Sequence, residues 1–491
     1  MKAGEARVKH KGLYLFAVLF ISLCLLPLVG MLWMPDTPSS DDDSRSPLPR
    51  WQAEDGSFSL AFFQDLGNYF EDHFAFRNIA IDLDAHLRAG MLQTSPTSQV
   101  IVGRDGWLFY GGTLDDYRGT KPLSAREIVN ISHNLSLMQG YTNAMGAEFV
   151  LAIAPNKNSL YPTYMPYYYL RGDNPSMQLL ADSLDSAGVN YVDLFALFDS
   201  VDDELYYRTD THWTSAGALL VTNALLDAGG IVPALPGEPL PGSINGDIER
   251  MLYPVSAGVE ESPLLSTGSW SYSGAWDYSG SSNSLAAVSL AAASVEDDVL
   301  TTTSDAGTGS LLMYRDSFAN TLIPLLAPQF AEAEFTKMIP YNLTLIAQLK
   351  PDVVIIERAE RHIGLFMESP PYMYAPSTAV QVGTTLAGES YVDWHLDGDF
   401  LVIEGYVDDA CIDTNDQIYV SLAGTDAAAV SFVPFFINYE APSSSGSTSS
   451  YGFRLFLDAG SLTNSTYTIR ILVAPASAGI ADIVAVATLQ L

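Results

Sequence analysis

The chain has 491 residues, which is too long for one ordinary hydrophobic core and predicts two or three domains. Its 57 acidic and 23 basic residues give a formal net charge of −34. A surface this acidic repels polyanions, so we expect no nucleic-acid partner, and a long anionic polymer only where basic residues cluster.

The N-terminus predicts a membrane anchor. An uncharged stretch over residues 13–34 is about as long as a membrane-spanning helix and follows a basic segment containing Lys2, Arg7, Lys9 and Lys11. This asymmetry places residues 1–12 in the cytoplasm and the rest of the chain outside the cell membrane, as a single-pass protein. A cleaved signal peptide is the alternative, but the apolar run is long for one and lacks a small-x-small cleavage site.

Residues 35–56, rich in Asp, Ser and Pro, predict a solvated linker. Apolar residues then recur at helical spacing from Ser57 to Leu92, with an interruption at 72–77. A strand-like run with glycine turns on either side follows at 101–112. Cys24 lies in the span, which leaves Cys411 without an external cysteine to pair with.

Short apolar runs then alternate with helical patterns, which predicts an α/β domain with a parallel sheet over residues 57–376. The expected strands are 149–154, 189–194, 310–314, 334–339 and 352–357. The expected helices are 124–145, 177–187, 215–228, 318–326 and 343–349. Ligands in such sheets bind beyond the carboxyl ends of the strands.

Residues 233–309 interrupt this alternation and are rich in Ser, Gly and Ala. The segment is either a flexible insertion or a lid over the site, and the sequence leaves both open. From residue 377 onward, short alternating runs separated by turns predict a β-sandwich over 377–491, with strands near 400–406, 417–422, 430–437, 452–457, 467–473 and 483–489.

Three side chains suggest covalent acyl transfer. Asp210 and His212 lie two residues apart before an expected helix, and Ser317 follows the apolar run 311–314 at a strand-to-helix turn. They supply an orienting carboxylate, a general base and a nucleophile. When each motif is taken alone, helix-capping residues and a partly buried histidine are the better explanation.

Asn156 and Lys157 directly follow the strand at 149–154, and Asn156 is a candidate oxyanion donor, although a loop asparagine is the plainer explanation. Basic residues are scarce outside the N-terminus, yet several lie in or beside the motif segments: Arg104, Lys157, Arg208, Arg315, Arg358 and Arg361. They suit an anionic substrate group, or else form structural ion pairs. One Asp-x-His pair lacks the ligand spacing of a metal site, and we expect no metal and no cofactor.

Five segments together resemble the SGNH-hydrolase superfamily, in the branch of the AlgX/AlgJ-type alginate O-acetyltransferases and DHHW proteins. They appear in the family's order over about residues 60–365: 72–77, 103–109, 155–157, 208–214 and 316–318. The resemblance implies a permuted, flavodoxin-like sheet in which Asp and His precede Ser. It assigns Ser317 as nucleophile, His212 as base and Asp210 as orienter. Arg315 departs from the pattern, because the family usually has Gly there.

The resemblance further implies an extracytoplasmic O-acetyltransferase or acetylesterase acting on a cell-surface or exported polysaccharide. The acetyl donor would then come through a membrane acyl-exporting partner, and the C-terminal domain could bind carbohydrate. A non-catalytic glycan-binding or assembly protein is the alternative, and Arg315 is its main support. The sequence does not determine the acceptor sugar, the donor or the oligomeric state.

Overall fold

The computed structural model describes residues 2–33, 46–52, 57–269, 271–274, 299–424, 428–440, 448–462, 466–475 and 480–490. The chain forms two compact units. The first comprises Met1–Gly111, Arg208–Asp210 and Asn245–Glu260, and the second comprises Gly112–Tyr207, Thr211–Ile244 and Glu261–Leu491. Most of the expected linker at 35–56 lies outside the described residues, as does the part of the insertion from 275 to 298.

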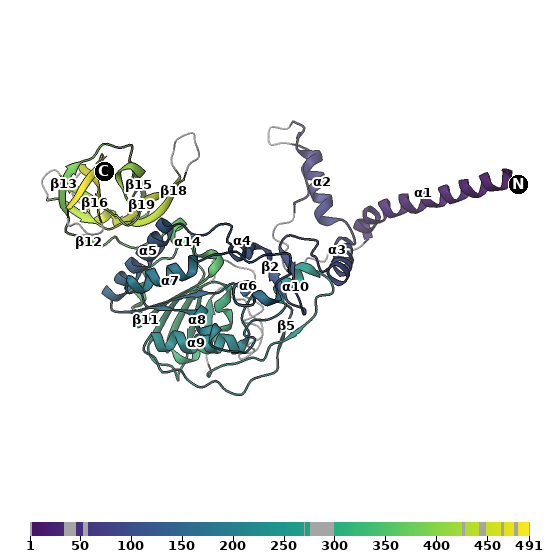
Figure 1. Ribbon diagram of the computed structural model, residues 1–491, viewed down its shortest axis with the longest axis horizontal. Coiled ribbons are helices and arrows are strands. Elements are labelled where there is room, and N and C mark those ends of the chain that lie inside the picture. The colour runs from purple at the N-terminus through teal and green to yellow at the C-terminus, as the bar shows by residue number, and fades with distance from the viewer. Residues whose placement is uncertain are drawn as a thin grey trace. The chain divides into compact units, whose positions relative to one another are not determined.

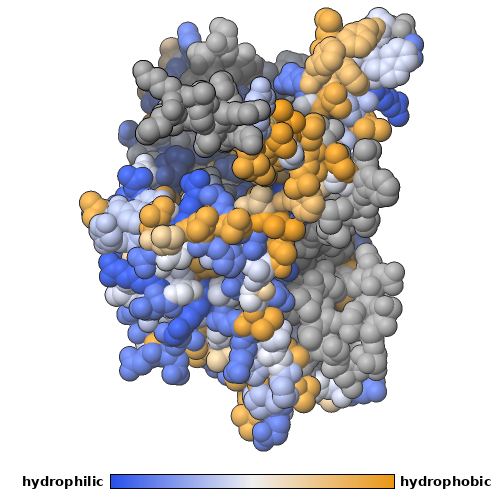
Figure 2. Space-filling view, turned by 90° about the vertical axis from the view of Figure 1, so that its right-hand side faces the viewer, coloured by the Kyte–Doolittle hydropathy of each residue, from blue (hydrophilic) through white to orange (hydrophobic). Residues whose placement is uncertain are grey.

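The first unit begins with α1 (Lys2–Trp33), which is long and apolar enough to cross a membrane over Leu13–Met31. The helical spacing expected over 57–92 is confirmed as α2 (Phe62–His73), α3 (Arg77–Leu87) and the π-helical turn η2 (Arg88–Leu92). These elements leave many apolar side chains exposed, among them Phe63, Leu66, Ile79, Leu83 and Leu87. Figure 2 shows clusters of hydrophobic residues on the face of the molecule that it presents.

The strand-like run at 101–112 is a hairpin instead of a single strand. The strands β1 (Val100–Val102) and β2 (Leu108–Tyr110) pair antiparallel, because Asp105 and Gly106 both adopt positive φ and reverse the chain. The short helix α10 (Asp247–Leu252) packs on this hairpin, and Ile248 and Leu252 are fully buried in the small core that they share.

The second unit contains the α/β layer (Figure 1), and the α/β class is confirmed. Its sheet has the strand order β4-β3-β11-β9-β10-β8-β7. The strands are β3 (Glu148–Ala154), β4 (Tyr191–Val192), β7 (Ser271–Gly274), β8 (Val299–Thr303), β9 (Ser310–Tyr314), β10 (Glu332–Thr336) and β11 (Val353–Ala359). The strands from β4 to β10 run parallel, as expected, but β8 pairs antiparallel with β10, and β7 pairs antiparallel with β8. The sheet is therefore mixed, because strands from the interrupting segment extend its edge.

Helices cover both faces of this sheet. One face packs on α5 and α7, whose buried leucines and isoleucines share a core with β3, β9 and β11, and α8 and α9 contact β3 from the other side (Figure 1). The helices of the layer are α4 (Leu114–Arg118), α5 (Ala125–Ala144), α6 (Lys157–Leu160), α7 (Ser176–Ser186), α8 (Leu194–Asp199), α9 (Ser215–Ala228), α12 (Ile323–Leu326), α13 (Leu345–Leu349) and α14 (Leu365–Glu368). The helix expected at 318–326 is divided into the 3-10 turn η5 (Ser317–Thr321) and α12, which has Pro324 in its first turn.

The C-terminal region is rich in strands, as expected, and forms two sheets with the orders β12-β17-β16-β20-β21-β13 and β14-β15-β19-β18. Their strands are β12 (Ser377–Thr378), β13 (Gln381–Thr385), β14 (Tyr391–Asp397), β15 (Phe400–Tyr406), β16 (Gln417–Gly424), β17 (Val430–Phe432), β18 (Phe435–Glu440), β19 (Thr448–Asp458), β20 (Thr466–Ala474) and β21 (Ile480–Gln490). One core contains alternate residues of both sheets, such as Leu401 of β15 and Ile418 of β16. Val402 on the opposite face of β15 belongs to the core that includes α5.

Candidate active site

The candidate residues of the second unit lie at the carboxyl edge of the parallel strands. Asn156 and Lys157 follow β3, Ser317 follows β9, and Glu360 follows β11. Because β3 and β9 both pair with β11 in parallel register, these chain ends lie beside one another. This is the edge at which α/β sheets bind ligands.

Asp316 fixes the turn that carries Ser317. One carboxylate oxygen of Asp316 accepts a hydrogen bond from the Phe318 N–H at 2.9 Å, and the other accepts one from the Ala359 N–H at 2.9 Å. Burial raises the pKa of Asp316, but hydrogen bonding from His362, the charges of Arg358 and Arg361 and the Ala359 N–H together hold it well below its usual range. Asp316 is therefore an ionised cap of the nucleophile turn and ties it to the end of β11.

His212 and Ser317 lie within hydrogen-bonding distance of each other. His212 Nε2 is 2.9 Å from Ser317 Oγ, and His212 Nδ1 is 3.2 Å from the hydroxyl of Thr211. The loop that carries His212 is closed by a hydrogen bond of 3.1 Å from the Tyr207 N–H to the His212 carbonyl. A base and a hydroxyl nucleophile in this geometry can exchange a proton.

Aromatic packing fixes the imidazole. The His212 ring lies 4.8 Å from the buried ring of Phe318, which also makes an edge contact of 4.9 Å with Trp213. The indole N–H of Trp213 donates to the Thr321 hydroxyl at 2.8 Å. The residues next to the base thus pack against the residues that follow the nucleophile, which couples the two loops.

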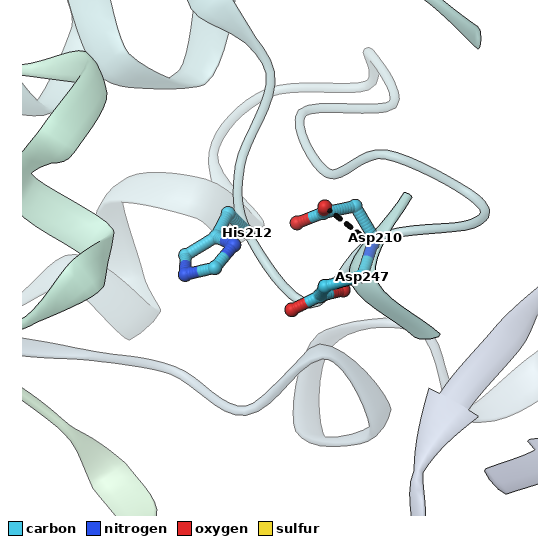
Figure 3. Close-up of side chains that lie close together, drawn as sticks. All are labelled: Asp210, His212 and Asp247. Atoms are coloured by element: carbon cyan, nitrogen blue, oxygen red, sulfur yellow. Dashed lines mark hydrogen bonds between the residues drawn. The ribbon is translucent and has the colours of Figure 1, made fainter. Parts of the chain in front are cut away.

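Asp210 belongs to the first unit and is 8% exposed. Its Oδ2 accepts a hydrogen bond of 2.9 Å from the N–H of Asp247, at the start of α10 (Figure 3). The carboxylate of Glu260 accepts hydrogen bonds from the N–H groups of Arg208 and Thr209 at 2.9 and 3.0 Å, and from the Thr209 hydroxyl at 2.7 Å. Segment 245–260 therefore holds the backbone and the carboxylate of 208–210.

Asp247 and Glu260 were not predicted from the sequence because they lie in the interrupting segment, whose composition suggested a flexible insertion or a lid. Gly246 was the one residue in this segment whose type could have indicated a close contact with residues 208–210. A Cβ at Gly246 would collide with the carbonyl of Thr209, so only glycine permits this close approach.

The two candidate residues after β3 are buried. The side-chain amide of Asn156 donates to Asp116 Oδ2 at 3.0 Å, and its backbone N–H donates to Glu360 Oε2 at 2.7 Å. The ammonium group of Lys157 donates to the carbonyl of Tyr207 at 3.1 Å. Lys157 thus supports the start of the loop that carries His212, and Asn156 retains a second amide hydrogen.

The two candidate arginines differ in environment. Arg315 is fully buried, and its Nη1 donates to Asn320 Oδ1 at 2.8 Å and to the Asp316 carbonyl at 3.3 Å. Arg208 is exposed, and its backbone is held by Glu260. Because the Arg315 side chain is fully buried, it offers no accessible charge to a substrate.

Comparison with known proteins bears on this arrangement. Residues 100–231 match the family model described as SGNH hydrolase-like domain, acetyltransferase AlgX. The chain contains an SGNH hydrolase-like domain. The match includes Asn156, Lys157, Asp210 and His212, whereas Ser317 lies beyond it.

Relatives of the SGNH-like domain include the probable alginate O-acetylase AlgJ of Pseudomonas syringae pv. tomato, which is 30% identical over 183 residues, or 35% of this chain and 43% of the relative. The chain thus spans less than half the length of this relative. Among solved structures, a DHHW family protein from Eubacterium siraeum is 14% identical with a TM-score of 0.42, covering 54% of this chain and 92% of the other. The O-acetyltransferase domain of Pseudomonas putida AlgJ is 19% identical with a TM-score of 0.35, at the same coverage of 54% and 92%.

Proposed function

We propose that the protein is a serine-dependent O-acetyltransferase that acts on hydroxyl groups of a polysaccharide, with acetyl-ester hydrolysis as its activity when water replaces the acceptor. The observation that carries the proposal is the distance of 2.9 Å between His212 Nε2 and Ser317 Oγ at the carboxyl edge of the sheet. The relationship to probable alginate O-acetylases supports the same reaction class.

The chemistry follows from the two atoms in contact. His212 Nε2 takes the hydroxyl proton as Ser317 Oγ attacks the acetyl carbonyl, and the imidazolium returns this proton to the departing oxygen of the donor. An acetyl ester remains on Ser317. His212 then removes a proton from an acceptor hydroxyl, whose oxygen attacks the ester and restores the serine. Exclusion of water favours transfer over hydrolysis.

In this proposal Asp210 holds the imidazole tautomer, and its own carboxylate is held by the Asp247 N–H. The oxyanion is stabilised by the N–H of Ser317 and the remaining amide hydrogen of Asn156. The Phe318 N–H is unsuited to this role because it already donates to Asp316.

We also propose that α1 anchors the protein in the cell membrane with the SGNH-like domain outside, where a membrane acyl-exporting partner supplies acetyl groups. A Cβ at Gly30 would meet Ala75 and Phe76, so the end of the apolar span lies against the junction of α2 and α3. The exposed apolar side chains of α2 and α3 are consequently held close to the outer end of the span. Protease protection of tagged termini in intact cells tests this orientation.

The catalytic proposal is tested with p-nitrophenyl acetate. Ser317→Ala and His212→Ala should each abolish hydrolysis while the circular dichroism spectrum stays unchanged. Ser186→Ala, at the exposed end of α7, is the matched control and should retain full activity. Equal turnover by wild type and Ser317→Ala would refute the proposal.

A further inference from the structure

A cavity of about 370 Å³ lies within the second unit, at the same sheet edge as Ser317. Its lining includes Asp116 and Tyr117 of α4, Ala181 of α7, Tyr191 of β4 and Glu360. The volume is within the range of small-molecule sites, which typically combine apolar and aromatic walls with a few polar groups. Glu360 and Tyr117 are each 7% exposed, so both a carboxyl group and an aromatic ring are largely enclosed.

The cavity walls are held by hydrogen bonds of their own. The side-chain amide of Asn174 donates to the Asp116 carbonyl at 3.0 Å, and the Gly172 N–H donates to the Tyr117 carbonyl at 3.0 Å. Gly172 approaches α4 so closely that a Cβ would collide with the Arg118 carbonyl. The wall formed by residues 171–174 is therefore pinned to α4, and the cavity is preformed.

Glu360, in the wall of the cavity, is linked to the nucleophile turn through the chain and one hydrogen bond. Glu360 follows Ala359, whose N–H is bonded to Asp316, and Ser317 follows Asp316. Neighbouring strands lie roughly 5 Å apart. In the sheet, Glu360 follows β11, which is next to β9, and Tyr191 belongs to β4, which is three strands away from β9. The cavity therefore begins about one strand spacing from β9 and ends about three strand spacings from it. The end of the cavity at Glu360 is therefore separated from the strand that carries Ser317 by less than the length of a short oligosaccharide.

The charges of the lining disfavour sugars that carry a carboxylate. Four carboxyl groups line the cavity, from Asp116, Asp173, Asp193 and Glu360, against the single guanidinium of Arg171. Burial, followed by the charge of Asp116, raises the pKa of Glu360 to about 7, and burial also raises the pKa of Asp116. The carboxylate of a uronate bound here would be repelled by the carboxylates of the lining. The hydroxyl groups of an uncharged sugar can instead donate hydrogen bonds to carboxylate oxygens.

We propose that this cavity is the acceptor subsite of the enzyme and that it selects an uncharged, hydroxyl-rich sugar over a uronate. The ring of the sugar packs against Tyr117 and Tyr191, its hydroxyls donate to Asp116 and Glu360, and the neighbouring sugar unit presents a hydroxyl to Ser317. The assignment as an acceptor subsite rests on the proposed function, but binding is measurable without catalysis.

The test uses the full chain carrying Ser317→Ala, so that ligands bind without turnover, and isothermal titration calorimetry with cellotetraose, mannotetraose, chitotetraose and tetramannuronate. At least one neutral tetrasaccharide should bind, and tetramannuronate should not. Ala181→Phe, which fills the cavity from α7, should weaken binding by about tenfold or more. Leu179→Phe adds a ring to the same helix outside the cavity and should leave binding unchanged.

Binding of tetramannuronate equal to that of the neutral sugars would overturn the selectivity, and so would the absence of neutral binding. Equal binding by the Ala181→Phe and Leu179→Phe variants would overturn the location. These outcomes are independent of the catalytic proposal. If ester hydrolysis depends on Ser317 but no neutral sugar binds, only the proposed acceptor subsite is refuted. If a neutral sugar binds but no ester is hydrolysed, only the proposed catalytic activity is refuted.

Discussion

Glu360→Gln should change how the stability of the protein depends on pH. The Glu360 side chain is buried, and its carboxylate accepts hydrogen bonds from the Asn156 N–H and the Ser159 hydroxyl. Burial, with the nearby charge of Asp116, nevertheless raises its pKa from 4.5 to about 7. Between these two values the folded protein holds a proton that the unfolded chain has released, so the free energy of unfolding falls as the pH rises.

The magnitude follows from the shift. At 1.36 kcal/mol per pKa unit, a rise from 4.5 to about 7 corresponds to about 3 kcal/mol, fully present below pH 4.5 and lost as the pH rises through 7. Glutamine cannot titrate, so the unfolding free energy of wild type minus that of Glu360→Gln should fall by about this amount between pH 4.5 and pH 8. Taking the difference cancels the contributions of other carboxyl groups, such as Asp316, whose lowered pKa acts in the opposite direction.

Urea denaturation at a series of pH values, followed by the fluorescence of the buried tryptophans, measures this difference. Glu148→Gln, at the exposed start of β3, controls for the removal of one negative charge. A difference between wild type and Glu360→Gln that stays constant from pH 4.5 to pH 8 would refute the reasoning.

Three further variants test the supports of the site. Gly246→Ala should lower the free energy of unfolding by about 1–3 kcal/mol and slow ester hydrolysis, because its Cβ meets the Thr209 carbonyl. Gly67→Ala, which has open space around it, is the control and should have neither effect. Equal effects of the two substitutions in thermal denaturation would contradict this prediction. Phe318→Ala should cost about 3–5 kcal/mol in urea denaturation, since a buried ring is removed, and a loss under 1 kcal/mol would speak against the packing described. Glu260→Gln should lower kcat for acetyl-ester hydrolysis and leave tetrasaccharide binding unchanged; an unaltered kcat would show that Glu260 does not position the 208–210 segment.

Periodicity predicted the elements whose apolar pattern is long and regular. The strand at 310–314, the helix at 215–228 and the strand at 400–406 are observed with those bounds. The expected strand at 189–194 contracts to Tyr191–Val192, because Asp193 caps α8 by accepting from the Ala196 N–H. Alternation alone could not reveal this competing cap.

The sequence could predict only part of the geometry of the candidate site. The motifs indicated His212 and Ser317, and the structure brings them together although 104 residues separate them in the chain. The sequence could not indicate that Asn156 is engaged by Asp116, that Arg315 is fully buried, or that Glu260 and the Asp247 N–H hold segment 208–210. The contacts of Asn156, Glu260 and Asp247 join segments far apart in the chain, whose composition alone carries no signal, and the burial of Arg315 depends on how its turn packs.

The central claim, that Ser317 carries the acetyl group, is tested most directly by trapping it. The full chain is mixed with p-nitrophenyl acetate without a glycan acceptor, quenched with acid and analysed by intact mass and peptide mapping. The account predicts one added acetyl group on the peptide containing Ser317, absent from Ser317→Ala and released on addition of a neutral acceptor. Acetylation at another residue, or equal labelling of wild type and Ser317→Ala, would contradict it.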